Sequence, residues 1–426
     1  MTKKMNSHLS LNTLDEWLFY LESIHPVEID MTLDRILVVK ERLNIAFADK
    51  KVITVGGTNG KGTTCAFIEN ALIASGYKVA VYSSPHIERF NERLRVNKAL
   101  IDDQSLIDAF REIENQRREI SLSYYEYTTL AALMICQQRD INYVILEVGL
   151  GGRLDATNII DADVSVITSI DLDHQQFLGN DRASIGLEKA GICRTNRPAV
   201  IGEPNLPEPV KGYLSELQSI NYYRNDAFFA EDNETEPGHW HWHFDNVRLT
   251  NLVPPNIPRD NVATALMVLS LISDDVTRTL TTENVNQWIS QTKVPGRTEI
   301  VARHPDVMLD VAHNPHAARH LAKVIASKNY QRVHAVVGML ADKDIDSTLA
   351  AIKDQIDDWY PVSLGVGRAA DAQVLVEALA KLKVNTIGFD KVSDGFKIAK
   401  DNANKNDMIL VFGSFFTVAE FKKSCL

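Results

Sequence analysis

Cysteine is scarce in this sequence, and the few cysteines lie far apart. Four occur in 426 residues, at Cys65, Cys136, Cys193 and Cys425, with no C-x-x-C pair. This spacing favours reduced thiols in a cytoplasmic protein over a disulfide framework or a zinc site. The initial M-T-K-K-M-N-S-H-L-S lacks the apolar run of a secretory signal, and no stretch approaches the roughly 18 apolar residues that span a bilayer. We therefore expect a cytoplasmic protein with no membrane partner.

Positive charge is also in short supply. The chain has 45 Lys and Arg against 56 Asp and Glu, a net charge of −11. Proteins that bind nucleic acid concentrate basic residues, so we expect no nucleic-acid partner, and any bound phosphate should be held by a local site. Apolar residues make up 45% and charged residues 24%, which is typical of a soluble globular protein, and the length predicts two domains.

Apolar patterns along the chain predict an α/β fold. Two helical patterns occupy residues 12–45, and near-continuous apolar runs then alternate with helical patterns, which is typical of a mostly parallel sheet buried on both faces. The segment 203–258 is richer in proline and predicts a small antiparallel sheet, and K-V-P-G-R at 293–297 predicts a hinge. After the hinge, strand and helix patterns alternate again, which predicts a second, doubly wound Rossmann-like domain. The predicted strands are residues 51–55, 78–84, 143–149 and 164–170, and after the hinge 307–313, 333–340, 384–389 and 408–414.

The stretch G-G-T-N-G-K-G-T-T from Gly56 to Thr64 follows a β-rich run and precedes a helical pattern. Glycine-rich turns in this position present backbone N–H groups to phosphate, and Lys61 adds a point charge. The spacing differs from G-x-x-x-x-G-K-[S/T], because two residues separate the glycines and Gly62 follows the lysine. A tight turn without a ligand is the alternative, and a lysine inside the glycine cluster makes it the weaker one.

Three polar side chains lie at or just beyond predicted strand ends, where ligands gather in open α/β sheets. They are Ser84, Glu147 and His174. A hydroxyl, a carboxylate and an imidazole can hold Mg²⁺ together with nucleotide phosphates and waters. Taken singly, Ser84 could be a helix cap, and His174 could be a polar residue whose hydrogen bonds are satisfied within the protein. Glu147 is harder to dismiss, because an acid inside an apolar strand costs several kcal/mol unless it is paired or metal-bound.

Further polar residues follow these strands and the hinge. The run G-L-G-G-R-L-D-A-T-N at 149–158 packs three glycines, Arg153 and Asp155 behind Glu147, and we interpret it as a substrate-contact loop. Arg297 lies in the hinge, and Asp310 and His313 end a predicted strand after it. If both domains contribute, the site is a cleft that closes on its nucleotide and excludes water.

Some conspicuous features favour structural roles. His239, His241 and His243 alternate with Trp240, Trp242 and Phe244, so the imidazoles share one strand face. A transition-metal site is conceivable there, but a solvated β face is favoured. The acidic run 231–236 predicts a solvated loop, and Cys65 a small core residue.

Taken in order, the motifs resemble those of folylpolyglutamate synthases in the Mur-ligase superfamily, with the closest likeness to the bifunctional bacterial dihydrofolate synthase/folylpolyglutamate synthases. The resemblance extends from about residue 12 to the C-terminus and makes residues 1–296 an ATP-binding central domain and 297–426 a glutamate ligase domain. The motifs that carry it are G-T-N-G-K-G-T, Y-S-S-P-H, L-E-V-G-L-G-G-R-L-D-A-T-N, L-D-H, E-K-A-G-I, P-G-R and D-V-A-H-N-P-H-A.

The resemblance implies roles for residues that match these motifs. Lys61, Glu147, His174 and Lys189 would be catalytic, and Lys189 matches a lysine that is carbamylated in the family; an ordinary helix lysine is the alternative. Ser84 and Glu147 would hold one Mg²⁺, and Glu147 and His174 a second, with K⁺ as a candidate monovalent cation. The implied ATP contacts are Thr58, Asn59, Gly60, Lys61, Gly62, Thr63, Asn261, Arg297 and Asp310. The implied pterin contacts are Ser23, Ile24, His25, Pro26, Ser123, Tyr124, Tyr125, Glu126, Leu154, Asp155 and Ala156.

The implied reaction joins L-glutamate to dihydropteroate and to tetrahydrofolate or its polyglutamates. A substrate carboxylate takes the γ-phosphate of ATP, and the glutamate amine then attacks the acyl phosphate. The expected partners are these small molecules, and we expect a monomer. Tyr124 and Tyr125 suit a flat heterocycle, and equally suit core positions at the start of a helix.

Other functions fit the sequence less well. A monofunctional folylpolyglutamate synthase shares the same catalytic residues. A muropeptide ligase would need a UDP-binding domain before the phosphate loop, for which the sequence leaves no room. A non-catalytic ATP-binding regulator would have no chemical reason to keep Lys61, Glu147, His174, Lys189 and Asp310, and a simple P-loop kinase is disfavoured by the irregular loop. Five residues depart from the family pattern and bear on substrate preference: Thr32, Asp171, Gln175, Gln176 and Phe416.

Overall fold

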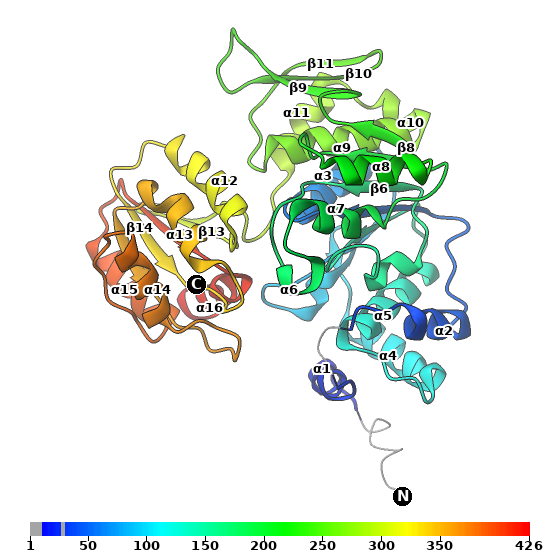
Figure 1. The fold of residues 1–426 in the computed structure, drawn as a ribbon, viewed down its shortest axis with the longest axis horizontal. Coiled ribbons are helices and arrows are strands. Elements are labelled where there is room, and N and C mark those ends of the chain that lie inside the picture. Colours follow the sequence, from blue (N-terminus) through cyan, green and yellow to red (C-terminus); the bar gives the residue numbers. More distant parts are fainter. Residues whose placement is uncertain (1–10, 27–29) are drawn as a thin grey trace, which may run out of the picture. The chain divides into compact units, whose positions relative to one another are not determined.

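The structure is a computed structural model that describes residues 11–26 and 30–426 (Figure 1). Its described residues form two compact units. Unit 1 comprises the chain up to Ser84, Asn91–Pro255 and Arg259–Gln291, and unit 2 comprises Pro85–Phe90, Asn256–Pro258 and Thr292–Leu426. The second unit thus takes in two short segments that precede the predicted hinge.

Unit 1 is built on an eight-stranded sheet, in the order β4-β3-β2-β5-β1-β6-β7-β8. In this sheet order, each neighbouring pair from β2 through β5, β1, β6 and β7 to β8 is parallel. Strands β3 and β4 extend the β2 side of the sheet with antiparallel pairs. Central strands are buried throughout, which agrees with their uninterrupted apolar runs. The strands are β1 Lys51–Gly56, β2 Val79–Tyr82, β3 Leu94–Val96, β4 Ala99–Leu100, β5 Tyr143–Glu147, β6 Val164–Ile167, β7 Pro198–Ile201 and β8 Ile220–Tyr223.

Helices cover this sheet in three groups. In the first, α3 packs against α9 and α11, and in the second α1 and α2 pack against α4 and α5 (Figure 1). In the third, α7 and α8 pack on each other and on β6 and β7. Both predicted helices within residues 12–45 are confirmed as α1 and α2. The helices of unit 1 are α1 Leu14–Ser23, α2 Asp34–Arg42, α3 Lys61–Ala74, α4 Asp103–Arg117, α5 Tyr124–Gln138, α6 Gln175–Leu178, α7 Arg182–Ala190, α8 Glu208–Glu216, α9 Arg259–Ile272, α10 Asp274–Arg278 and α11 Thr282–Gln291, with 3₁₀ turns η2 Phe90–Arg93 and η3 Ala156–Ile159.

The predicted antiparallel sheet exists, but it occupies less of residues 203–258 than expected. It contains β9 Phe228–Asp232, β10 Trp240–Phe244 and β11 Val247–Leu252. The start of the segment instead forms helix α8 and strand β8, which joins the large sheet in parallel. The predicted small antiparallel sheet is therefore confirmed, but only in the second half of this region. The acidic run is likewise not entirely a loop, because Glu231 and Asp232 belong to β9.

Unit 2 contains a five-stranded sheet in the order β12-β13-β16-β14-β15, parallel except for β12. Alternate residues of β13 enter different core clusters, with Val307 and Leu309 in one and Met308 in the other. The sheet is thus buried on both faces, as a doubly wound domain requires. Its elements are β12 Glu299–Ala302, β13 Asp306–Asp310, α12 Pro315–Ala326, β14 Val333–Val337, α13 Ile345–Ile352, η4 Lys353–Gln355, β15 Asp358–Pro361, α14 Ala372–Lys381, α15 Val392–Asn402, β16 Met408–Phe412 and α16 Phe415–Cys425.

One predicted strand of unit 2 is wrong. Residues 384–389 form no strand, and Phe389 makes only an isolated bridge to Val362. Ile387 is 71% exposed, so the apolar run does not enter the core. The edge position is taken by β15, which the sequence pattern missed because its D-W-Y-P run is short and ends in proline. Proline is tolerated there because an edge strand has one side without a partner strand.

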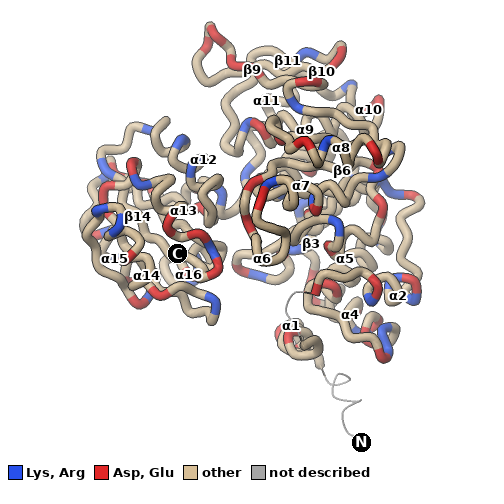
Figure 2. Tube along the Cα trace, viewed as in Figure 1, with Lys and Arg blue, Asp and Glu red and all other residues tan. Residues whose placement is uncertain are grey.

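The structure also shows how charges and thiols are distributed in the described part of the chain. Basic and acidic residues interleave along both units (Figure 2). All four cysteines are free thiols, and Cys65 is fully buried, which raises the pKa of its thiol well above the ordinary value. In residues 11–26 and 30–426 the helices are too short or too polar to cross a bilayer.

Candidate functional site

The glycine-rich stretch forms the turn between β1 and α3. Gly60 caps the helix in a left-handed conformation, with φ of 89°, and α3 starts at Lys61. Lys61 Nζ donates to the carbonyl oxygens of Gly57 at 3.0 Å and Thr58 at 3.3 Å. The ammonium therefore lies over the loop at the amino-terminal end of α3, where backbone N–H groups also favour an anion.

A segment directly after β6, which was not among the predicted site residues, holds this loop in place. Thr58 N donates to Ser169 O at 2.8 Å, and Asn59 N donates to Ser169 Oγ at 3.1 Å. Thr168 Oγ1 donates to Asn59 O at 2.7 Å. These bonds satisfy the loop's polar groups and fix its shape before any ligand arrives. Hydroxyl residues directly after an apolar strand were the signal available in the sequence.

Asn261 is brought to the loop from α9, as the resemblance implied. Its Nδ2 donates to Thr63 Oγ1 at 2.8 Å, and both groups are buried. A Cβ atom added to Gly60 would lie 2.5 Å from Asn261 Oδ1. The amide thus packs directly against the turn, so the glycine is needed for space as well as for its backbone conformation.

We predict that Gly60→Ala weakens ATP binding whereas Gly76→Ala does not. Both glycines flank α3 and have nearly equal φ values, 89° and 90°, so an added methyl costs each about 1–2 kcal/mol of backbone strain. A Cβ at Gly76 meets nothing within 4 Å, whereas at Gly60 it displaces Asn261. KM for ATP and thermal unfolding of both variants test this. Equal KM values for ATP in the two variants would show that ATP binding does not depend on the present position of Asn261.

Three further predicted residues share the carboxyl edge of the sheet with the loop. The strand order β2-β5-β1-β6 places Ser84, Glu147, the loop and His174 at successive strand ends. Glu147 is buried, and both its carboxylate oxygens would lie 3.6 Å from a Cβ on Gly62. His174 precedes α6 with a positive φ of 52°. Because Glu147 lies beside the phosphate loop, its carboxylate can share a cation with a bound phosphate.

Lys189 lies in α7 and is 4% exposed. Burial and the nearby charge of Lys61 lower the pKa of its ammonium to about 7, against partial opposition from Asp173 and Asp155. A Cβ on Gly152 would lie 2.7 Å from Glu188 O and 3.0 Å from Lys189 Cα, so the glycine-rich loop packs on this helix. A large fraction of the amine is therefore neutral near pH 7.

Asp155 organises the loop at residues 149–158, which the sequence predicts to contact the substrate. Its carboxylate accepts from Gly149 N at 3.0 Å, Leu150 N at 2.8 Å and Thr157 N at 2.9 Å. Burial raises the pKa of Asp155 although these bonds lower it. Arg153 pairs with Glu188 at 2.8 Å. Both charged groups thus hold the loop in shape.

The implied pterin residues of the α5 start lie next to this loop. Tyr125 stacks on Tyr82 with ring centroids 6.2 Å apart, and its hydroxyl would be 2.6 Å from a Cβ on Gly149. Arg93 lies over the ring of Tyr124 at 5.7 Å. Ser123 and Glu126 form a capping box. Contacts within the protein hold each of these side chains in place. A pterin would therefore bind to a surface that is already formed. The remaining implied pterin contacts lie at the end of α1 (Ser23, Ile24, His25 and Pro26) and around Asp155 (Leu154 and Ala156).

In unit 2, the predicted residues gather at the end of β13. Asp310 is buried and accepts from Thr298 N and Ala312 N, each at 2.8 Å. Burial raises the pKa of its carboxyl, and the charge of Arg297 opposes that shift. Arg297 also lies 5.5 Å from the ring centre of Phe415. His313 Nδ1 lies 2.8 Å from Val311 O.

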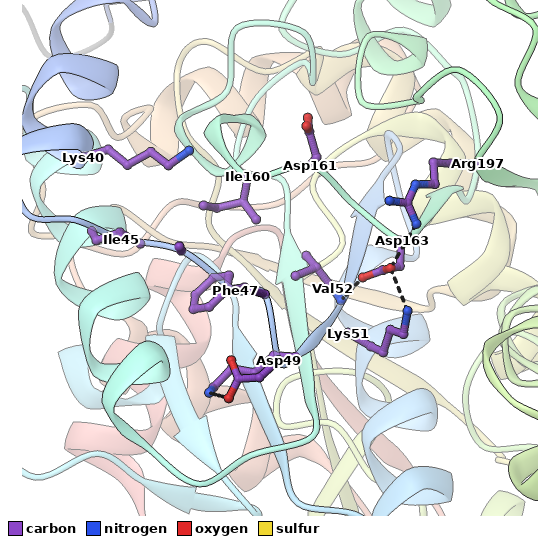
Figure 3. A pocket seen from close by; sticks show the side chains of 13 residues that line it. Lys40, Ile45, Phe47, Asp49, Lys51, Val52, Ile160, Asp161, Asp163 and Arg197 are labelled. Atoms are coloured by element: carbon purple, nitrogen blue, oxygen red, sulfur yellow. Dashed lines mark hydrogen bonds and ion pairs between the residues drawn. The ribbon is translucent and has the colours of Figure 1, made fainter.

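A pocket of about 530 Å³ lies elsewhere, at the amino ends of β1, β6 and β7 (Figure 3). None of the predicted site residues lines it. Asp163 binds both Lys51 at 3.1 Å and Arg197 at 3.2 Å, and Lys40 donates to Ile159 O at 2.9 Å. Asp49 pairs with Lys50 inside the pocket, whereas Asp161 pairs with Arg194 outside it. The lining residues are Lys40, Ile45–Val52, Ile160, Asp161, Asp163 and Arg197.

His241 and His243 lie on one face of β10, whereas His239 precedes the strand. Trp240 and Trp242 are fully buried, and His241 and His243 are partly exposed, which confirms the predicted alternation. His241 Nδ1 accepts from Asn251 N at 3.1 Å, and His243 stacks on Phe229 at 4.6 Å.

Comparison with known proteins relates both units to one enzyme class. Residues 55–201 match the Mur ligase middle domain, and residues 296–415 match the Mur ligase, glutamate ligase domain. The chain is 45% identical over 409 residues to the dihydrofolate synthase/folylpolyglutamate synthase of Escherichia coli (strain K12), covering 95% of this chain and 94% of that protein.

Solved structures show the same relationship. The E. coli FolC structure in complex with DHPP and ADP has a TM-score of 0.91 and 43% identity, covering 97% of each chain. A bifunctional folylpolyglutamate synthase/dihydrofolate synthase with Mn, AMPPNP and L-glutamate bound has a TM-score of 0.89 and 43% identity, covering 97% of this chain and 98% of that one.

Proposed function

The chain belongs to the dihydrofolate synthase/folylpolyglutamate synthase family of Mur ligases, and on this premise we propose that it joins L-glutamate to dihydropteroate and to tetrahydrofolate or its polyglutamates with ATP. The observation that carries the proposal is 45% identity over nearly the whole of the chain and of its relative. A phosphate loop with Lys61, Glu147 and Asn261 gathered around it supports the ATP-dependent chemistry.

The reaction proceeds in two steps. The substrate carboxylate attacks the γ-phosphorus of ATP, which gives an acyl phosphate and ADP. The α-amine of L-glutamate then attacks the acyl carbon, and phosphate leaves as the amide forms. Lys61 and the N–H groups of the loop offset charge on the phosphoryl group during the first step. His174 is assigned a ligand role rather than that of a base.

A divalent cation fits the residues at this edge of the sheet. The buried Glu147 carboxylate lies beside Gly62 and is a hard oxygen donor, and Ser84 and His174 follow neighbouring strands. We propose that Ser84 and Glu147 hold one Mg²⁺ and that Glu147 and His174 hold a second, with K⁺ as a further candidate. The metal supplies charge neutralisation at the transferring phosphoryl group.

Lys189 is proposed to carry a carbamate. A neutral amine attacks CO₂ and loses a proton, which gives an anionic oxygen donor in place of a cation. The lowered pKa of about 7 supports this, because carbamate formation requires the neutral amine. The unmodified ammonium would repel Lys61 and any bound metal.

The remaining assignments come from the resemblance and are proposals for this chain. Thr58, Asn59, Thr63 and Asn261 would bind ATP, as would Arg297 and Asp310 of unit 2. The functional division is proposed at 296/297, and the protein is proposed to act as a monomer.

Glutamate-dependent ADP release, measured with dihydropteroate and with tetrahydrofolate in turn, tests the function. We expect turnover with both substrates and none without glutamate. Turnover with tetrahydrofolate alone would identify a monofunctional folylpolyglutamate synthase, and turnover with neither would refute the proposal.

A further inference from the structure

Arg35 joins two chain segments that the proposed function assigns to the pterin. Its Nη2 donates to both carboxylate oxygens of Glu126, each at 3.1 Å, and its Nη1 lies 2.8 Å from Asp30 Oδ2. Asp30 in turn lies 3.3 Å from His25 Nε2. We call these four residues, His25, Asp30, Arg35 and Glu126, the Arg35 clasp. It connects the end of α1, the first turn of α2 and the first turn of α5.

Burial makes the clasp more than a surface ion pair. The side chains of Glu126 and His25 are 4% and 6% exposed, and those of Arg35 and Asp30 are each 24% exposed. Burial would lower the pKa of Arg35, but its bonds to Glu126 and Asp30 outweigh that effect and raise it. Glu126 also accepts from Ser123 N at 2.7 Å. Removing the guanidinium would leave the Glu126 carboxylate buried without its cation.

Several polar atoms on this clasp and beside it have no hydrogen-bond partner among the described residues, although they are buried. They are His25 Nδ1, Thr32 Oγ1 and Arg35 Nε. Buried polar atoms are nearly always paired, so two unpartnered atoms on one connected clasp favour a polar ligand there. Arg35 Nε–H is a donor, and His25 Nδ1 is an acceptor in the neutral tautomer that donates Nε2–H to Asp30. A heterocycle whose edge alternates donors and acceptors complements such a set.

We propose that Arg35 is a positioning residue for the pterin substrate, holding the end of α1 and the start of α5 in the arrangement that receives the ring. This inference rests on the proposed function. Arg35 acts through Glu126 and Asp30, and a displacement of either segment loosens the pterin contacts without touching the phosphate loop. Thr32, which departs from the family pattern, lies two residues from Asp30 and supplies one of the unpartnered atoms.

The test is the Arg35→Gln variant, with separate KM values for dihydropteroate, ATP and L-glutamate. We expect KM for dihydropteroate to rise at least about tenfold, because small misplacements of binding groups have effects of this order. KM for ATP and L-glutamate should change by less than about twofold, as for substitutions away from a site. Arg35→Lys should be intermediate, because one ammonium cannot reproduce the paired bonds to Glu126.

Arg42→Gln is the matched control on the same helix. Arg42 also bridges α2 to another element, donating to Gln116 O at 3.1 Å and Arg117 O at 2.9 Å, and pairing with Glu119 at 2.9 Å. It contacts neither pterin segment through these bonds. We expect its variant to lose stability while all three KM values stay within about twofold of wild type.

The outcomes separate the possibilities. An unchanged KM for dihydropteroate in Arg35→Gln, or an equal rise in all three KM values, would reduce Arg35 to a structural ion pair and overturn the inference. If Arg35→Gln does not fold, Arg35→Lys keeps a cation beside Glu126 and carries the same comparison of the three KM values. Failure of the wild-type protein to use dihydropteroate would instead overturn the proposed function, and the inference with it.

Discussion

Replacing Lys61 with alanine is expected to lower kcat for glutamate-dependent ADP release by about 10²–10³-fold or more, as for the loss of one group that stabilises charge in the transition state. Lys61 Nζ lies over the loop, bound to two of its carbonyl oxygens, and we propose that it is the cation that meets the γ-phosphate. Rapid-quench measurement of the first turnover separates phosphoryl transfer from product release. Circular dichroism should show an unchanged fold.

Lys51→Ala is the matched control for that variant. Lys51 starts β1 at the opposite edge of the sheet, is 57% exposed and pairs with Asp163. We expect turnover close to that of wild type. Wild-type turnover in Lys61→Ala would mean that the γ-phosphate lies elsewhere.

Lys189→Ala is expected to lower activity by at least about 10²-fold, because it removes the proposed carbamate from a site where fixed charge stabilises the reacting groups. Added acetate should restore part of the activity by supplying a carboxylate in the space left by the side chain. Lys189→Arg keeps a positive charge but cannot form a carbamate, so it should be inactive and not rescued by acetate. Full activity in Lys189→Arg would refute the modification.

The pKa of Lys189 also predicts how stability depends on pH. The ammonium pKa is about 7 in the folded chain against an ordinary 10.5, so between these pH values the unfolded chain binds more protons. Stability therefore rises with pH from about 7 towards 10.5, and the cost of burying Lys189 is greatest below pH 7. In CO₂-free buffer, Lys189→Met should accordingly gain more stability over wild type at pH 6 than at pH 9. A difference independent of pH would contradict the lowered pKa.

Local sequence patterns correctly predicted the strands and turns that depend mainly on residues adjacent in the chain. Lys51–Gly56 and Tyr143–Glu147 are apolar runs long enough for buried strands, and they form adjacent parallel strands. The glycines after β1 predicted a turn, and the turn is there. The strand at 384–389 failed because its pattern is equally compatible with an edge loop, and the choice between it and Asp358–Pro361 depends on pairing with β14. That pairing is not encoded by either run alone.

The sequence alone was enough to predict the fold class, the positions of the central strands along the chain, and the motifs that place it among glutamate-adding folate ligases. Tertiary structure decided which residues support the site. Asn261 lies 198 residues from its partner Thr63, and Arg35 lies 91 residues from Glu126. The pKa of Lys189 similarly arises from burial in α7 and from Lys61, which is distant in the sequence. Periodicity reports which face of an element is apolar, whereas hydrogen bonds, burial and charge between distant residues exist only once the chain has folded.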